Sequence, residues 1–233
     1  MPLQLTNNIF FIDRFFFKHL SFFSKSSIFY NSKNIEKFFR IITKFWEGYF
    51  ELSLIFILFL FIFLNKKKSH IFKKYITGIF FTLLFTQITV NLFKLLFGRA
   101  RPSVMANPEK FYGVLSLIKN NFFFEGDYAS FTSGHSITIW GTIWILSFFI
   151  KNRYIKTLLF LLGFLVGISR IYLVYHWTTD VIASIIISYS IAKFVYNKIN
   201  PQQNRHRYAK KPKKIQKIKQ KRESMGLVTY QQK

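Results

Sequence analysis

Residues 75–102 read YITGIFFTLLFTQITVNLFKLLFGRARP. The stretch contains no charged residue before Lys94, and Arg99 and Arg101 follow shortly after it. A helix needs roughly 20 apolar residues to cross the hydrocarbon core of a bilayer. The stretch therefore predicts a membrane-spanning helix, which Pro102 would stop. Lys94 and Arg101 are seven residues apart, about two helical turns, so the helix is expected to point both cations the same way near its end.

The composition of the whole chain also indicates a membrane protein. Hydrophobic residues make up 51% of the 233 residues, Phe alone occurs 32 times, and the formal net charge is +25. A chain can be this apolar and this basic only if its charged and apolar residues are segregated. Cysteine is absent, which excludes a disulfide framework, a thiolate nucleophile and a thiolate metal site.

The apolar segments predict an all-α fold, a polytopic membrane bundle of five or six transmembrane helices. The five apolar runs cover residues 49–64, 75–97, 136–150, 155–175 and 178–196. A further segment, residues 9–30, has its apolar residues interrupted by charges. Its polar residues recur with helical spacing, namely Arg14, Lys18, Ser21 and Lys25. This pattern favours a helix lying in the membrane interface, and insertion as a sixth span is the alternative.

The charge of the short connections predicts which side of the membrane each lies on. Residues 65–74 and 151–156 carry Lys and Arg without any acid, and residues 198–222 do the same. Short loops rich in Lys and Arg stay in the cytoplasm. The other ends of the spans, with the long segment 98–133, are therefore expected outside. For a bacterial inner membrane this predicts a functional site at the periplasmic face.

The distribution of charge divides the chain into three predicted parts. Residues 1–46 form an interfacial segment, residues 47–197 the transmembrane core, and residues 198–233 a basic cytoplasmic tail. The run of Lys and Arg in the tail is also compatible with nucleic-acid binding, but its basic stretch contains no stacking aromatic residue except Tyr208. Attraction to anionic lipid head groups of the inner leaflet is the simpler account, so no nucleic-acid partner is predicted.

Polar residues that can take part in catalysis or bind a ligand lie at the predicted outer ends of the spans. Ser133, Gly134 and His135 open one span, where backbone N–H groups and the positive end of a helix bind anions. His176 and Asp180 are four residues apart at the start of the last span. The carboxylate is expected to accept a hydrogen bond from one ring nitrogen of His176, which leaves the other nitrogen to act as a nucleophile.

Three cations complete the predicted site. Arg101 and Arg170 offer planar paired donors that match phosphate oxygens, and Lys94 acts as a point charge. Arg99 has no place in this set and is expected at the membrane interface. A cluster with so much positive charge repels metal ions, so the sequence predicts phosphoryl-transfer chemistry with no metal and no cofactor.

These residues resemble the motifs of the type 2 phosphatidic acid phosphatase superfamily. The family pattern is Lys-x6-Arg-Pro, then Pro-Ser-Gly-His, then Ser-Arg-x5-His-x3-Asp. The chain matches this pattern from Lys94 to Asp180, except that Thr132 replaces the proline that opens the second motif. The resemblance implies a membrane lipid phosphatase with a phosphohistidine intermediate. The implied catalytic residues are the nucleophile His176, its orienting carboxylate Asp180 and the general acid His135. The implied phosphate-binding residues are Lys94, Arg101, Ser133, Gly134 and Arg170.

The sequence leaves the lipid substrate open. Head-group selection is expected in the loop 102–131, which holds Tyr112, Tyr128 and the run 122–124 of phenylalanines. A site at the outer face favours a cell-envelope lipid, with a lipid A phosphate or undecaprenyl diphosphate ahead of phosphatidylglycerol phosphate or phosphatidate. The alternatives are a catalytically inactive lipid-binding homologue and a transporter. The sequence predicts no oligomeric state.

Overall fold

The computed structural model describes residues 2–21, 24–25, 32–45, 69–120 and 126–201, together with residues 53, 56, 57, 60 and 64. The helices are α1 (Pro2–Leu20), α2 (Lys33–Phe45), α4 (Ser69–Phe97), α5 (Gly113–Lys119), α6 (Gly134–Phe149), α7 (Arg153–Tyr172) and α8 (Thr178–Ile199). A short 3-10 helix covers Gly126–Tyr128. No strand occurs in the described residues, where Arg99 and Phe111 form an isolated bridge. The predicted all-α class is confirmed.

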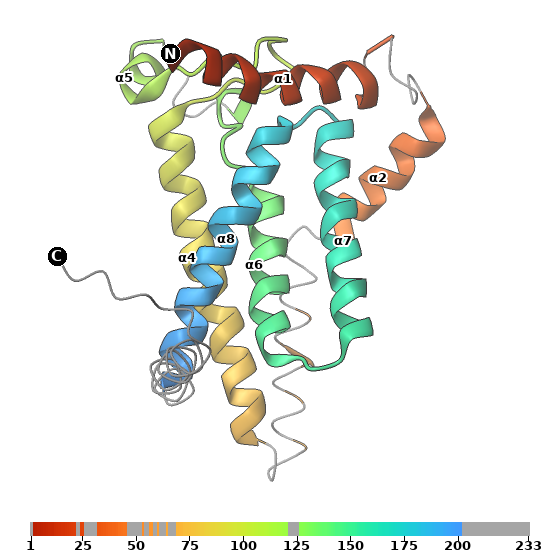
Figure 1. Cartoon of the computed structure of the whole chain (residues 1–233), viewed down its shortest axis with the longest axis vertical. Coiled ribbons are helices and arrows are strands. Elements are labelled where there is room, and N and C mark those ends of the chain that lie inside the picture. The colour runs from red at the N-terminus through yellow and green to blue at the C-terminus, as the bar shows by residue number, and fades with distance from the viewer. Residues whose placement is uncertain are drawn as a thin grey trace, which may run out of the picture.

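Helices α4, α6, α7 and α8 form a bundle with α6 in contact with each of the other three (Figure 1). Trp140 and Ile143 of α6 pack against α7 in a buried apolar cluster. Gly163 of α7 makes this packing possible, because a Cβ atom there would lie 2.7 Å from the side chain of Ile143. This close contact holds α6 and α7 together near the middle of both helices.

Three of the described helices are long and apolar enough to cross a membrane: Phe72–Phe97, Arg153–Tyr172 and Thr178–Ile199. They coincide with three of the five predicted spans, and they identify a membrane protein. Helix α6 has 16 residues, fewer than the roughly 20 that a full crossing needs. The predicted span 49–64 lies mostly outside the described residues, and so does the basic tail beyond residue 201. A total of five or six spans stays a prediction.

Helix α1 lies across the end of the bundle where α4 ends and α8 begins (Figure 1). The sequence predicted a helix in residues 9–30 that only rests on the membrane surface, whereas the helix covers residues 2–20. It also contacts α7 and α8 directly. Its Asp13 is buried against α8, so α1 is part of the packed protein at this end.

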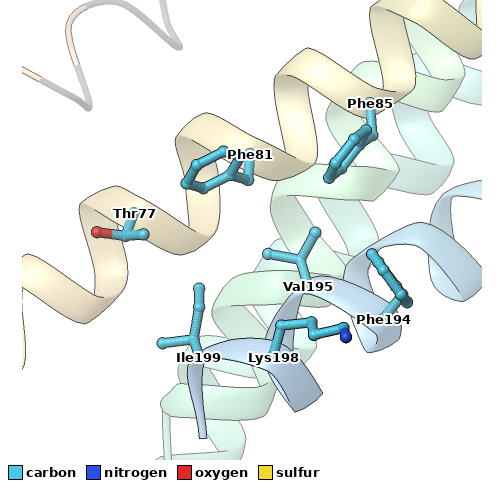
Figure 2. A pocket seen from close by; sticks show the side chains of 7 residues that line it. All are labelled: Thr77, Phe81, Phe85, Phe194, Val195, Lys198 and Ile199. Carbon is cyan, nitrogen blue, oxygen red and sulfur yellow. The ribbon is translucent and has the colours of Figure 1, made fainter.

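An apolar pocket of about 250 Å³ lies between α4 and α8 (Figure 2). Thr77 lies near the beginning of α4 and Ile199 ends α8, so the pocket is at the opposite end of the bundle from α1. Phe81, Phe85 and Phe194 line it, and Lys198 is the one charged residue among the described residues that does so. The predicted catalytic residues do not contribute to this pocket.

Candidate active site

The first motif begins with Lys94 in the last turn of α4. The helix ends three residues later, at Phe97. Gly98 has a positive φ of 53°, and its N–H donates to the carbonyl of Lys94 at 3.1 Å, a C-terminal arrangement that glycine favours. The helix therefore stops at Phe97, and Arg101 lies in the following loop. The predicted placement of Lys94 and Arg101 on one helical face is wrong. The fold nevertheless brings the two cations within electrostatic range of each other.

The second motif begins α6 as predicted. Ser133 is the N-cap residue, and its Oγ accepts a hydrogen bond from the N–H of Ser136 at 3.4 Å. A Cβ atom on Gly134 would lie 3.7 Å from Nζ of Lys94. The ammonium group of Lys94 is thus beside the first turn of α6, whose unpaired backbone N–H groups can bind an anion.

The third motif begins with Ser169 and Arg170 in the last turn of α7 and ends with Asp180 in the first turn of α8. Arg170 is buried, and its guanidinium group stacks on the ring of Tyr175 at 4.4 Å. The backbone N–H groups of Tyr175 and His176 donate to the carbonyl of Arg170 at 3.1 and 3.3 Å. This tight turn places His176 next to Arg170. Each of the two site histidines, His135 and His176, lies within electrostatic range of Lys94, Arg101 and Arg170.

The environment of His176 fixes its protonation. Its Nδ1 lies 2.8 Å from the backbone carbonyl of Ser130. A carbonyl only accepts hydrogen bonds, so Nδ1 carries the proton and Nε2 keeps its lone pair. Burial lowers the pKa of His176 well below its ordinary value, and the charges of Arg170, Arg101 and Lys94 lower it further. The imidazole is therefore neutral near neutral pH, as a nucleophile must be.

The predicted hydrogen bond between His176 and Asp180 is absent. Nδ1 of His176 lies 3.9 Å from Oδ2 of Asp180, which is longer than a hydrogen bond. That carboxylate oxygen accepts instead from Oγ of Ser130 at 2.5 Å and from the N–H of Trp177 at 2.9 Å. Asp180 thus reaches His176 through Ser130. Ser130 could not be predicted from the sequence, because its contribution to His176 is a backbone carbonyl, which every residue type has.

The two arginines that follow α4, Arg99 and Arg101, differ in their surroundings. Burial lowers the pKa of Arg101, and the nearby carboxylates of Asp127 and Asp180 oppose this effect. Nε of Arg101 is buried without a hydrogen-bond partner among the described residues. Arg99 was expected at the membrane interface, and this expectation is wrong, because only 1% of its surface is exposed and it pairs with Asp13 and Asp180.

Aromatic side chains surround the loop that leads into α6. Phe131 packs against Phe97 with ring centroids 5.0 Å apart, and against Phe93 and Phe111 at 6.1 and 6.3 Å. Phe97 and Phe111 are also 40% and 38% exposed. An apolar surface therefore adjoins the residues that are predicted to bind phosphate. Of the loop aromatics predicted to select the head group, Tyr112 and Tyr128 pack edge to face at 5.1 Å, and residues 122–124 lie outside the described residues.

Comparison with known proteins identifies the family to which the chain belongs. The model of the PAP2 superfamily matches residues 75–204, more than half of the chain, so the chain belongs to this superfamily. The crystal structure of Aquifex aeolicus LpxE is similar, with a TM-score of 0.54 and 23% sequence identity over 71% of this chain and 88% of that chain. This likeness shows a shared fold. No curated protein matches the sequence. The family and the fold together support a membrane phosphatase.

Proposed function

We propose that the chain hydrolyses a phosphomonoester or diphosphate bond of a membrane lipid, with His176 as the nucleophile and without a metal ion. The observation that carries the proposal is the convergence of two histidines and three cations at one end of an apolar bundle. The three cations are Lys94, Arg101 and Arg170, and the second histidine is His135. Fixed positive charges of this kind stabilise a transferring phosphoryl group in place of magnesium.

The reaction proceeds in two displacements. Nε2 of His176 attacks phosphorus, and the bond from phosphorus to the lipid oxygen breaks. His135 donates a proton to that oxygen, so that the lipid leaves as a neutral alcohol, or as a lipid phosphate if the substrate is a diphosphate. Water then attacks the phosphohistidine, returns a proton to His135 and releases inorganic phosphate. Asp180 keeps the attacking ring in place through Ser130.

The aromatic surface supports a lipid as the substrate. Phe97 and Phe111 are exposed next to the loop that carries the second motif, and such side chains favour contact with acyl or prenyl chains. The N-terminal turn of α6 and the side chain of Lys94 would meet the phosphate. We place lipid A phosphate and undecaprenyl diphosphate ahead of phosphatidylglycerol phosphate and phosphatidate, since a periplasmic site would meet lipids of the outer leaflet.

Phosphate release from a panel of these four lipids, with a water-soluble phosphate ester beside them, tests the function. We expect the purified protein to release phosphate from at least one lipid in the presence of EDTA, and more slowly from the soluble ester. If no lipid releases phosphate, the chain is an inactive lipid-binding homologue or a transporter. If EDTA abolishes the activity and magnesium restores it, the metal-independent mechanism is wrong.

Cysteine labelling tests the orientation in the membrane. The chain has no cysteine, so single cysteines at Asn107, Ser69 and Ser224 can be labelled one at a time. A membrane-impermeant thiol reagent on spheroplasts is expected to label Asn107→Cys and to spare the other two, because Lys and Arg accumulate on their side. Permeabilised cells, in which all three should react, provide the control. Labelling of Ser69→Cys but not Asn107→Cys would place the site in the cytoplasm.

A further inference from the structure

We propose that Arg99 and Asp13 are positioning residues that hold His176 in its reactive orientation through Asp180 and Ser130. The proposal rests on the proposed function, because it assigns both residues to the same reaction. It makes helix α1 a working part of the active site. Arg99 is outside the motif positions, and Asp13 lies in a segment that the sequence predicted to rest on the membrane.

Every donor of the Arg99 guanidinium is used within the protein. Nη1 donates to Oδ1 of Asp180 at 2.5 Å and to Oγ1 of Thr179 at 2.7 Å. Nη2 donates to Oδ2 of Asp13 at 2.7 Å and to the carbonyl of Pro108 at 2.6 Å, and Nε donates to the same carbonyl at 3.0 Å. A guanidinium group has five N–H donors, so none remains for a substrate phosphate. Arg99 is therefore suited to hold protein groups in place.

Asp13 ties the same group to the start of α8. Its Oδ1 accepts the backbone N–H of Thr179 at 2.7 Å, and its Oδ2 accepts the hydroxyl of Thr179 at 2.7 Å. The side chains of Asp13 and Asp180 are fully buried on either side of Arg99, whose side chain is 1% exposed. Buried charges of this kind hold their geometry only while each keeps its partners. A carboxylate from α1 thus caps the helix that carries Asp180.

Ser130 connects this cluster to the nucleophile. Its N–H donates to the backbone carbonyl of Arg99 at 3.0 Å, and its hydroxyl donates to Asp180 at 2.5 Å. Its own carbonyl accepts the Nδ1 proton of His176 at 2.8 Å. Arg99 therefore holds Ser130 twice, once through its backbone and once through Asp180. A displaced guanidinium would move the carbonyl that fixes the tautomer and direction of the imidazole ring.

The expected kinetic signature is a loss of kcat with little change in KM. Neither Arg99 nor Asp13 is free to contact the phosphate, so substrate binding should be preserved, whereas misalignment of a nucleophile slows the chemical step. We expect Asp13→Asn to lower kcat about tenfold and to change KM by less than about twofold. Arg99→Lys, which keeps the charge but loses the planar fork, should lower kcat further.

The neighbouring residue provides a matched control. Arg14 follows Asp13 on α1 and forms an exposed ion pair with Glu109. Arg14→Gln removes this second tie between α1 and the loop without touching Arg99, and it should keep the wild-type kcat. If Arg14→Gln lowers kcat as much as Asp13→Asn does, general loosening of α1 explains the effect and the proposal is overturned.

A double-mutant cycle with Asp180→Asn decides whether the effect passes through Asp180. Because the proposed route includes that carboxylate, Asp13→Asn should lower the residual rate of Asp180→Asn by less than about twofold. Equal losses in both backgrounds, or a kcat within about twofold of wild type for both Asp13→Asn and Arg99→Lys, would overturn the proposal while leaving the phosphatase function intact. A wild-type protein without phosphatase activity would overturn both together.

Discussion

His176→Ala is expected to abolish phosphate release, with a fall in kcat on the order of 10⁴-fold or more. The reason is that Nε2 of this ring is the one nitrogen whose lone pair is left available by the hydrogen bond from Nδ1 to Ser130. Rapid quench of the wild type at alkaline pH should also trap phosphate on the protein, and His176→Ala should trap none.

Two other variants provide the comparison for His176→Ala. His19 lies on α1 and packs against Phe15, so His19→Ala should keep the wild-type rate. Asp180→Asn should keep a small residual activity, because the carboxylate orients the ring through Ser130 and does not itself react. Near-normal phosphate release by a folded His176→Ala protein would show that another residue is the nucleophile.

The membrane character and the motif residues could be predicted because both depend on local sequence. A long apolar segment needs no tertiary contact to identify it, and three of the predicted spans are described helices that are long and apolar enough to cross a membrane. Likewise, α6 begins at Gly134 with Ser133 as its N-cap, as the sequence predicts. Two geometric predictions were wrong, one for Lys94 with Arg101 and one for His176 with Asp180. Both depended on where a helix ends.

In both pairs, one residue lies outside the helix that contains the other, so helical spacing does not relate them. His176 precedes α8, which begins at Thr178, so the four-residue spacing to Asp180 does not give a helical turn. Arg101 follows α4, which ends at Phe97, so the seven-residue spacing from Lys94 does not either. Helix ends depend on single capping groups, such as the positive φ of Gly98, which hydrophobic periodicity does not register.

The different roles of Arg99 and Arg101 could not be predicted from sequence either. The two residues have the same side chain and lie two positions apart. Asp13 and Pro108, which occupy the donors of Arg99, are distant from it in the sequence or contribute only a backbone carbonyl. Asp13 is the one acid in the phenylalanine-rich residues 10–17, and an acid in such a stretch was the available signal that it has a buried partner.

Arg101→Lys is expected to lower kcat/KM about 100-fold, although it keeps the positive charge. The loop holds Arg101 in place, because its backbone N–H donates to the carbonyl of Asp127 at 2.8 Å. Its side chain also lies beside Gly126, where an added Cβ atom would be 3.8 Å from Nη2. Its buried Nε has no partner among the described residues. A planar fork with an open donor can bind two phosphate oxygens at once, and an ammonium group cannot.

Inhibition by vanadate gives a second measurement of the same interaction. Vanadate imitates the trigonal bipyramidal transition state, so its inhibition constant should weaken in Arg101→Lys by about the same factor as kcat/KM. The control is Arg153→Lys, since Arg153 lies at the opposite end of α7 from Arg170 and should leave both values unchanged. If Arg101→Lys keeps the wild-type kcat/KM and vanadate sensitivity, Arg101 does not bind the phosphoryl group, and Lys94 and Arg170 would have to stabilise it alone.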